Sequence, residues 1–75
     1  MTEGVYPAMA PIIVLGVNAA DPPFRIVEIK GEVVGKAFDL RDVLEFARRA
    51  GLEDLDLDDP KMVTWVGGDR YTWHA

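Results

Sequence analysis

The sequence predicts one small α+β domain, in which about five mainly antiparallel strands form a sheet and one helix packs on one face. Two observations support this prediction. Short runs rich in Ile, Val and Phe are separated by turn residues, and one later stretch, 39–50, has the apolar spacing of a helix. The chain of 75 residues is too short for two separate hydrophobic cores, which favours a single domain.

Two segments of different character open the chain. Residues 1–10 show no apolar period, so we expect a flexible leader before a domain that spans 11–75. Ile12–Val17 is a continuous apolar run, which predicts a strand covered on both faces. Pro22 and Pro23 follow, and because proline has no backbone N–H to donate to a neighbouring strand, the first strand must end before them.

The next two apolar runs predict a β-hairpin. Phe24–Ile29 and Glu32–Phe38 flank Lys30 and Gly31, and glycine adopts positive φ without a Cβ penalty. Gly35 interrupts the second run. A glycine inside a strand indicates a β-bulge or a place where another group packs closely.

The clearest element of the sequence is a helix over Asp39–Ala50. Asp39 can accept hydrogen bonds from the free amides of the first turn, and Asp42 adds a second carboxylate at the positive end of the helix dipole. Gly51 is expected to end the helix in a left-handed conformation, after which Leu52 folds back on the last turn. One apolar stripe runs along the helix and consists of Leu40, Val43, Leu44, Ala47 and Ala50.

Leucines alternate with acids in the segment 52–60, which predicts an extended edge segment or an ordered loop with a solvated acidic side. Five of the chain's thirteen acids lie here: Glu53, Asp54, Asp56, Asp58 and Asp59. The spacing of Asp54, Asp56 and Asp58 is the one that opens a calcium-binding loop. Asp59 stands where that loop needs glycine, however, so a solvated acidic loop is favoured and no metal or cofactor is expected.

The end of the chain predicts a second hairpin. Met62–Val66 and Arg70–His74 flank the turn segment 67–69, which contains two glycines and an aspartate. A three-residue loop would place Trp65, Trp73 and Tyr71 on one buried face. A two-residue loop at Gly67 and Gly68 is the alternative register, and it shifts these side chains relative to one another.

The hairpin–helix–hairpin order over residues 24–74 resembles the topology of β-grasp domains such as the ubiquitin-like sulfur carriers. Those carriers depend on a free C-terminal Gly-Gly, whereas Gly67 and Gly68 are internal here and the sequence ends Trp73-His74-Ala75. The resemblance therefore implies a fold and carries no expectation of a carrier function.

Composition excludes several chemistries. The chain has no cysteine, no serine and one histidine, which excludes disulfides, a thiolate nucleophile, a multi-histidine metal site and a Ser-His-Asp arrangement. His74 lies beside the last residue, so no enzyme activity is expected. The net charge of −5 disfavours nucleic acid and anionic membranes. No basic leader and no apolar run of ~20 residues is visible, so we expect a cytoplasmic protein without a membrane partner.

The balance of apolar area predicts a non-catalytic protein-interaction module. One helix cannot cover both faces of a five-stranded sheet, so apolar surface is left for a second copy of the chain or for a larger protein partner. A nucleic-acid-binding or regulatory accessory domain is the alternative, with Lys61, Trp73 and His74 among its residues. The acidic segment could also engage a basic partner. The candidate partner-binding residues are Arg48, Arg49, Arg70, Tyr71, Glu53, Asp54, Asp56, Asp58 and Asp59.

Overall fold

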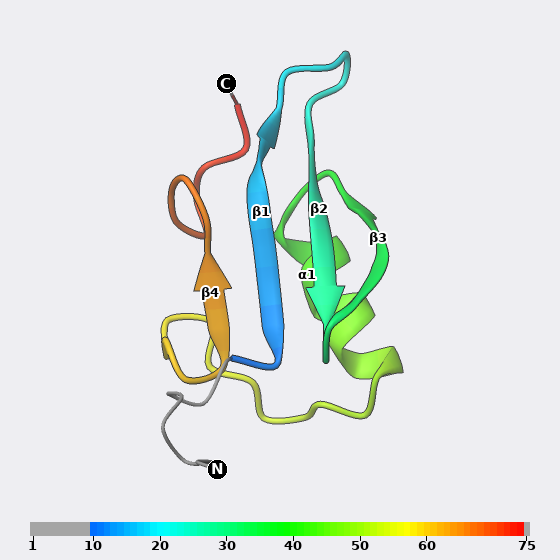
Figure 1. The fold of residues 1–75 in the computed structure, drawn as a ribbon, viewed down its shortest axis with the longest axis vertical. Coiled ribbons are helices and arrows are strands. Elements are labelled where there is room, and N and C mark those ends of the chain that lie inside the picture. The colour runs from blue at the N-terminus through cyan, green and yellow to red at the C-terminus, as the bar shows by residue number, and fades with distance from the viewer. Residues whose placement is uncertain (1–9, 75) are drawn as a thin grey trace, which may run out of the picture.

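A computed structural model describes residues 10–74. They form one helix and one mixed sheet of four strands in the order β3-β2-β1-β4 (Figure 1). The elements are β1 (Ile12–Asn18), β2 (Phe24–Ile29), β3 (Glu32–Ala37), α1 (Leu40–Arg49) and β4 (Val63–Trp65). The predicted α+β class is therefore confirmed, but the sheet has four strands rather than five. The flexible leader predicted for residues 1–10 lies outside the described residues, except for Ala10.

The hairpin of β2 and β3 follows the sequence prediction. Lys30 and Gly31 form its two-residue turn with φ values of 54° and 86°, the combination that suits the right-handed twist of the strands. The pairing slips between Val27 and Glu28, and the extra residue on β3 lies next to Gly35. A Cβ atom at Gly35 would lie 2.8 Å from Cζ of Phe46, so the glycine both marks a bulge and admits a close contact from α1.

Helix α1 begins and ends where the sequence predicts. Asp39 caps its start, because Oδ1 accepts hydrogen bonds from the backbone N–H groups of Arg41 and Asp42. At its end Gly51 has a φ of 82°, and the N–H of Leu52 donates to the carbonyl of Ala47 at 2.9 Å. This 6→1 bond is the Schellman closure that a C′ glycine favours.

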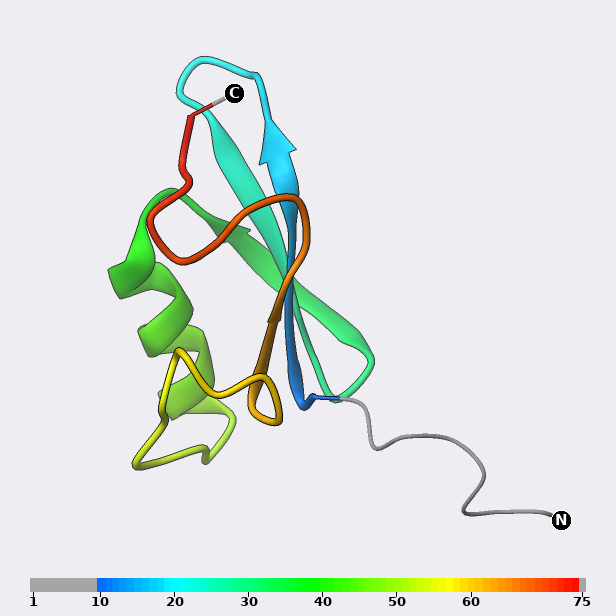
Figure 2. The same ribbon diagram turned by 90° about the vertical axis from the view of Figure 1, so that its left-hand side faces the viewer.

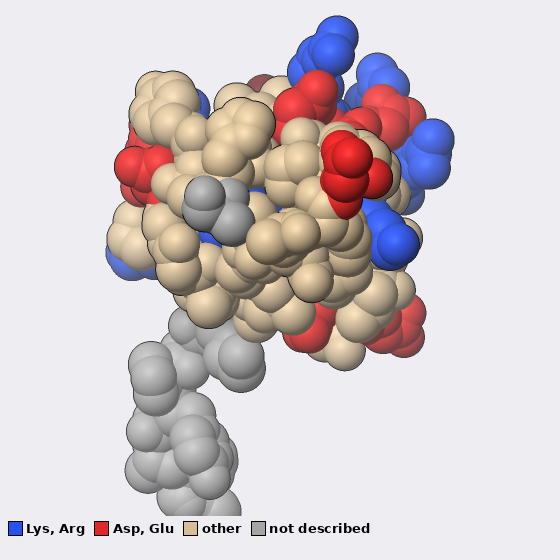
Figure 3. All heavy atoms as spheres, turned by 90° about the horizontal axis from the view of Figure 1, so that it is seen from above, with Lys and Arg blue, Asp and Glu red and all other residues tan. Residues whose placement is uncertain are grey.

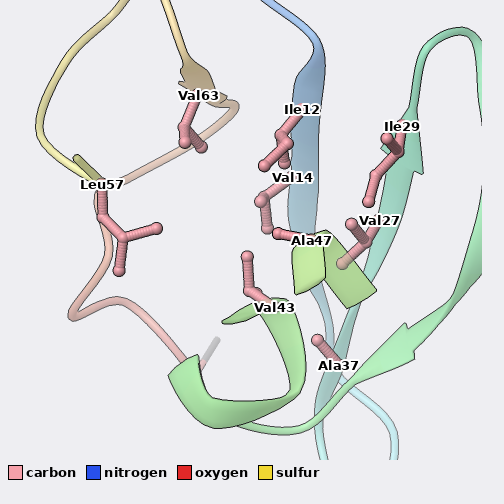
Figure 4. Packing of buried hydrophobic residues seen from close by; sticks show 9 residues of the cluster. All are labelled: Ile12, Val14, Val27, Ile29, Ala37, Val43, Ala47, Leu57 and Val63. Atoms are coloured by element: carbon pink, nitrogen blue, oxygen red, sulfur yellow. The ribbon is translucent and has the colours of Figure 1, made fainter. Parts of the chain in front are cut away.

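The core lies between the sheet and one covering layer. Figure 2 shows α1, the loop 50–62 and the segment 66–74 on the same side of the sheet. Side chains from β1, β2 and α1 point toward one another in this layer (Figure 4). The buried apolar cluster consists of Ile12, Val14, Val27, Ile29, Ala37, Val43, Ala47, Leu57 and Val63.

Strand β1 departs from its prediction in one respect. Its alternate residues Ile12 and Val14 are fully buried, whereas Ile13 between them is half-buried. The covering layer thus reaches one face of β1, and among residues 10–74 no element lies over the other face (Figure 2). The expectation of cover on both faces is not met, because α1, the loop 50–62 and the segment 66–74 all pack on the same face of the sheet (Figure 2).

The predicted C-terminal hairpin is absent. Only Val63–Trp65 forms a strand, β4, and it pairs in parallel with β1 instead of with residues 70–74. The segment 66–74 crosses the helix side of the sheet without strand structure, since its carbonyls serve another group (described below). The hairpin–helix–hairpin order on which the β-grasp resemblance rested is therefore not present.

Residues 52–60, before β4, form an ordered loop and not an extended edge segment. Leu57 is buried and Leu55 packs against the core, which ties the loop to the covering layer. The helix stripe is narrower than predicted, because Leu44 remains 41% exposed while Val43 and Ala47 are buried.

Candidate functional site

The most unusual feature of the structure is a fully buried arginine, Arg25 on β2. Its Nε donates a hydrogen bond to the carbonyl of Leu15 at 2.8 Å, and its Nη2 donates to the carbonyl of Val66 at 2.9 Å. Its Nη1 donates to two further carbonyls, those of Asp69 at 3.0 Å and Thr72 at 2.6 Å. Burying a charge is costly unless it is hydrogen-bonded, and these four carbonyls supply that compensation.

Two tryptophans enclose the Arg25 guanidinium. Its Cζ lies 5.3 Å from the ring centroid of Trp65 and 5.4 Å from that of Trp73, within the range of cation–π attraction. The two rings meet edge to face at 83°. Burial lowers the pKa of Arg25, and the negative charge of Asp69 opposes that shift. We call the two tryptophan rings and the four carbonyls around Arg25 the cage. Because three of these carbonyls belong to residues 66–72, the cage fastens the C-terminal segment to the sheet.

Sequence reasoning missed Arg25 although a signal was present. Strand β2 alternates, and Arg25, Val27 and Ile29 occupy the buried positions while the residues between them are half-buried. An arginine in phase with two buried aliphatic residues must either snorkel to the surface or find internal acceptors. Register alone could have raised this question, but it could not have named the acceptors.

A tight turn holds the carbonyls that Arg25 needs. Asp69 Oδ1 accepts hydrogen bonds from the N–H of Tyr71 at 2.9 Å and from the Thr72 hydroxyl at 3.0 Å. The hydrogen bond from Tyr71, followed by the one from Thr72, lowers the pKa of the Asp69 carboxyl. This side chain shapes the turn so that the carbonyls of residues 69 and 72 face the guanidinium.

Acid is expected to loosen this turn. Because the folded pKa of Asp69 is lowered, its stabilisation is complete above the unfolded value of about 3.9 and is lost as the pH falls through the folded pKa. An NMR titration should move the Tyr71 amide signal with a midpoint below about 3.9, and Asp69→Asn should abolish the transition. A midpoint at or above the ordinary aspartate value would contradict this assignment.

The sheet face opposite α1 is a second feature, and we call it the open face. Cross-strand partners share a face of the sheet, so the pairs Ile13↔Glu28 and Ile26↔Lys36 place these four side chains on it. Val33 lies opposite Glu28 and Thr64 lies opposite Ile13, so both belong to the open face as well. The pair Asn18↔Phe24 is on the same face. Phe38 packs edge to face on Phe24 with ring centroids 6.3 Å apart. The open face therefore combines these apolar side chains with one acid, one base and two uncharged polar residues, Asn18 and Thr64.

Exposure distinguishes the open face from the helix side. Val33 is 65% exposed and Phe38 is 47% exposed, whereas Ile13 and Ile26 in the centre are half-buried by their neighbours. Lys36 Nζ lies 4.5 Å from the ring centroid of Phe24 and extends over the apolar surface. Contiguous exposed apolar surface of this kind often marks an interaction site.

The structure divides the residues of the nucleic-acid alternative between helix α1 and the C-terminal segment. Arg48 and Arg49 both pair with Glu45 on α1, and the bond from Arg48 is the main cause that lowers the pKa of this glutamate. Arg70 and Tyr71 lie in the C-terminal segment, where the guanidinium stacks 5.0 Å from the ring centroid. Each arginine is thus engaged locally.

The aromatic residues do not share one face as the predicted hairpin required. Trp65 and Trp73 are half-buried around Arg25, and their Nε1 atoms donate to the carbonyls of Leu57 and Arg70. Tyr71 is 72% exposed. The tryptophans are therefore used inside the molecule, and the nucleic-acid interpretation remains a prediction without a stacking surface built from them.

The acidic segment divides into two parts. Asp56 and Asp59 accept hydrogen bonds from the backbone N–H groups of Asp58 and Lys61, and Asp58 lies 3.5 Å from Nε of Arg70. No hydrogen bond or ion pair to Glu53 or Asp54 is found within residues 10–74. Across these residues no group of three or more His, Asp or Glu side chains is placed to hold a metal ion.

Charges of both signs are interspersed on the surface. Seen from above, Lys and Arg gather mainly at the upper right, with Asp and Glu between them, while the middle of this end is largely uncharged (Figure 3). Among residues 10–74, no helix has the length and apolar character that crossing a bilayer requires.

The fold and these surfaces define a small α+β domain. One helix and the C-terminal segment that binds Arg25 cover one face of its four-stranded mixed sheet. Comparison of the chain with protein-family models, with curated proteins and with solved structures gave no match. The chemistry of the surfaces is therefore the basis for a functional assignment.

Proposed function

We propose that this protein is a non-catalytic interaction module that self-associates by packing the open face against the open face of a second copy. The observation that carries the proposal is the apolar side chains on the sheet face opposite α1, over which no element of residues 10–74 lies (Figure 2). Ile13, Ile26 and Phe24 lie on it in one patch, and Val33 extends the patch to the edge strand β3. Removing such a patch from water is the main favourable term in protein association.

The charges on the open face support a second copy as the occupant. A two-fold interface joins the same patch on both chains, so the patch must complement itself. Glu28 and Lys36 lie on the open face on either side of the β2–β3 bulge. In a two-fold arrangement, Glu28 of each copy can approach Lys36 of the other, while the apolar side chains meet between them.

Support for a non-catalytic role comes from what the carboxylates do. Asp39 caps α1, Asp42 accepts from the N–H of Phe38, and Asp69 shapes the C-terminal turn. Asp56 and Asp59 also cap backbone amides. Each of these acids serves local structure, and none of them faces another titratable group across a cleft as an acid–base pair would.

Sedimentation equilibrium over a range of concentrations tests the proposal. The wild-type protein is expected to dimerise with a Kd on the order of 10 μM, in the micromolar range of weak protein–protein interfaces. Val33→Glu, at an exposed position that can change without loss of the fold, should weaken the dimer at least tenfold. Leu44→Glu introduces the same charge on the helix side and should leave the dimer unchanged.

A charge exchange makes the test specific to the open face. Glu28→Lys should weaken the dimer, and the double variant Glu28→Lys/Lys36→Glu should restore it, since the interaction is then reversed in sign. A wild-type protein that stays monomeric at millimolar concentration would overturn the proposal. Equal weakening by Val33→Glu and Leu44→Glu would do so as well.

A further inference from the structure

A groove lies on the helix side of the molecule, away from the open face. It has a volume of about 470 Å³ and runs between α1 and the loop that follows it. Its floor is apolar and consists of Leu44, Ala47, Leu52 and Leu55. Ala47 is buried and the other three leave apolar atoms accessible, with Leu44 the most exposed at 41%.

The two sides of the groove differ in how their charges are compensated. On α1, Arg41 pairs with Asp39 at 3.2 Å, and Arg48 pairs with Glu45. On the loop side, Glu53 and Asp54 line the groove, and both are exposed. In the described part of the chain neither has a hydrogen-bond or ion-pair partner. Three acids, Glu45, Glu53 and Asp54, stand against two arginines in the lining of the groove, so its net charge is negative.

We infer that this groove binds a basic amphipathic helical segment of a different protein. Apolar side chains of that segment would cover the leucines of the floor, and a Lys or Arg beside them would pair with Glu53 and Asp54. Laying the apolar face of a helix into a groove is a recurrent mode of peptide recognition. The charge complementarity supplies orientation and speeds association more than it adds affinity.

The chain itself does not offer such a segment. Residues 1–10 contain one charged side chain, Glu3, and no Lys or Arg. The lysines Lys30, Lys36 and Lys61 stand singly in a turn, a strand and a loop. The adjacent arginines Arg48 and Arg49 belong to α1, which packs against β3 and is not free to enter the groove of a second copy. A different partner therefore fits the groove.

A synthetic helical peptide tests the inference by fluorescence anisotropy. The probe is an 18-residue peptide of Leu, Lys and Ala with leucines along one helical face and lysines beside them. Binding is expected with a Kd on the order of 100 μM at low salt and weaker binding at higher salt. Two control peptides are a glutamate-for-lysine version and an isomer with the leucines spread around the helix, and neither should bind.

Variants of the full chain localise the binding. Leu44→Glu should weaken binding of the probe peptide at least tenfold, and Glu53→Gln/Asp54→Asn should weaken it about three- to tenfold. The matched control Asp21→Asn/Glu32→Gln removes two exposed acids outside the groove and should have little effect. Equal binding of the isomer with spread leucines, or equal loss in both double variants, would overturn the inference.

The two surfaces can be tested independently. Val33→Glu lies on the open face and should bind the peptide as the wild type does, whether or not the wild-type chain dimerises. Loss of peptide binding in Val33→Glu would contradict a separate groove site. Absence of binding by the wild type at 1 mM peptide, a concentration about tenfold above the expected Kd, would also overturn the inference.

Discussion

Replacing Arg25 by methionine is expected to destabilise the protein by about 3 to 5 kcal/mol. The substitution keeps a long apolar stem but leaves four carbonyls without their donor, three of them in the segment 66–72. A domain of this size has only about 3 to 5 kcal/mol of stability from its core. Urea unfolding followed by tryptophan fluorescence should therefore show a largely unfolded chain or one whose C-terminal segment has detached.

Two comparisons separate the geometry of Arg25 from its charge. Arg25→Lys retains the charge, but an ammonium has only three donors on one atom and cannot reach four separate carbonyls. It also lacks the planar group that lies between Trp65 and Trp73. Most of the loss should remain. Arg49→Met removes an exposed arginine that bonds to Glu45 alone and should change stability by less than about 0.5 kcal/mol. Wild-type stability in Arg25→Met would show that the cage is not a determinant of the fold.

The second large effect is expected at Gly35, where alanine should cost about 2 to 4 kcal/mol. The φ of Gly35 is 154°, which side chains rarely adopt, and a Cβ would lie 2.8 Å from the Phe46 ring. The ring would have to move away from β3, and α1 packs on β3 partly through this contact. Thermal unfolding monitored by circular dichroism would measure the loss.

Gly31→Ala is the matched control, because Gly31 belongs to the same hairpin and also has positive φ. No atom lies within 4 Å of a Cβ at Gly31, so only backbone strain remains, about 1 kcal/mol. In addition, Gly35→Ala/Phe46→Ala should be less destabilised than the sum of its single variants, since the clash needs both side chains. Equal effects of alanine at the two glycines would exclude the Phe46 contact as the cause.

The predictions from sequence were confirmed where neighbouring residues decide the structure. The turn at Lys30 and Gly31, the cap at Asp39 and the C′ glycine Gly51 each act on amides or carbonyls within a few positions. Such signals operate in whatever surroundings the segment has. Gly35 was recognised as a bulge or a close contact for the same reason, although the sequence did not name Phe46 as the contacting residue.

The C-terminal hairpin was predicted wrongly because its residues have a competing partner far along the chain. Val66 and Gly67 form a turn and Gly68 a bend, as the glycines predict, but Arg25 takes the carbonyls that strand pairing would use. The acceptors of Arg25 in this segment stand 41, 44 and 47 positions away. Turn propensity carries no information about such a partner.

The candidate surfaces show the same division. One helix is too small to cover both faces of the sheet, which predicted that some apolar surface would remain exposed. The open face carries such surface. Which residues form the open face follows from the pairing register of β1, β2 and β3, including a bulge in each antiparallel pair. Leu44 was assigned to the core stripe, yet it lines the groove instead, because the loop 50–62 crosses the helix side without covering it.

The amino-acid sequence by itself determined the first hairpin, the helix with both of its ends, and the surplus of apolar side chains over what one helix can cover. The tertiary structure alone decided that residues 66–74 surround Arg25 on the helix side, so that no element of residues 10–74 covers the opposite face of the sheet (Figure 2). The physical reason is that caps and turns are satisfied within a few residues, whereas a buried guanidinium must be satisfied by whichever distant carbonyls the completed fold brings to it.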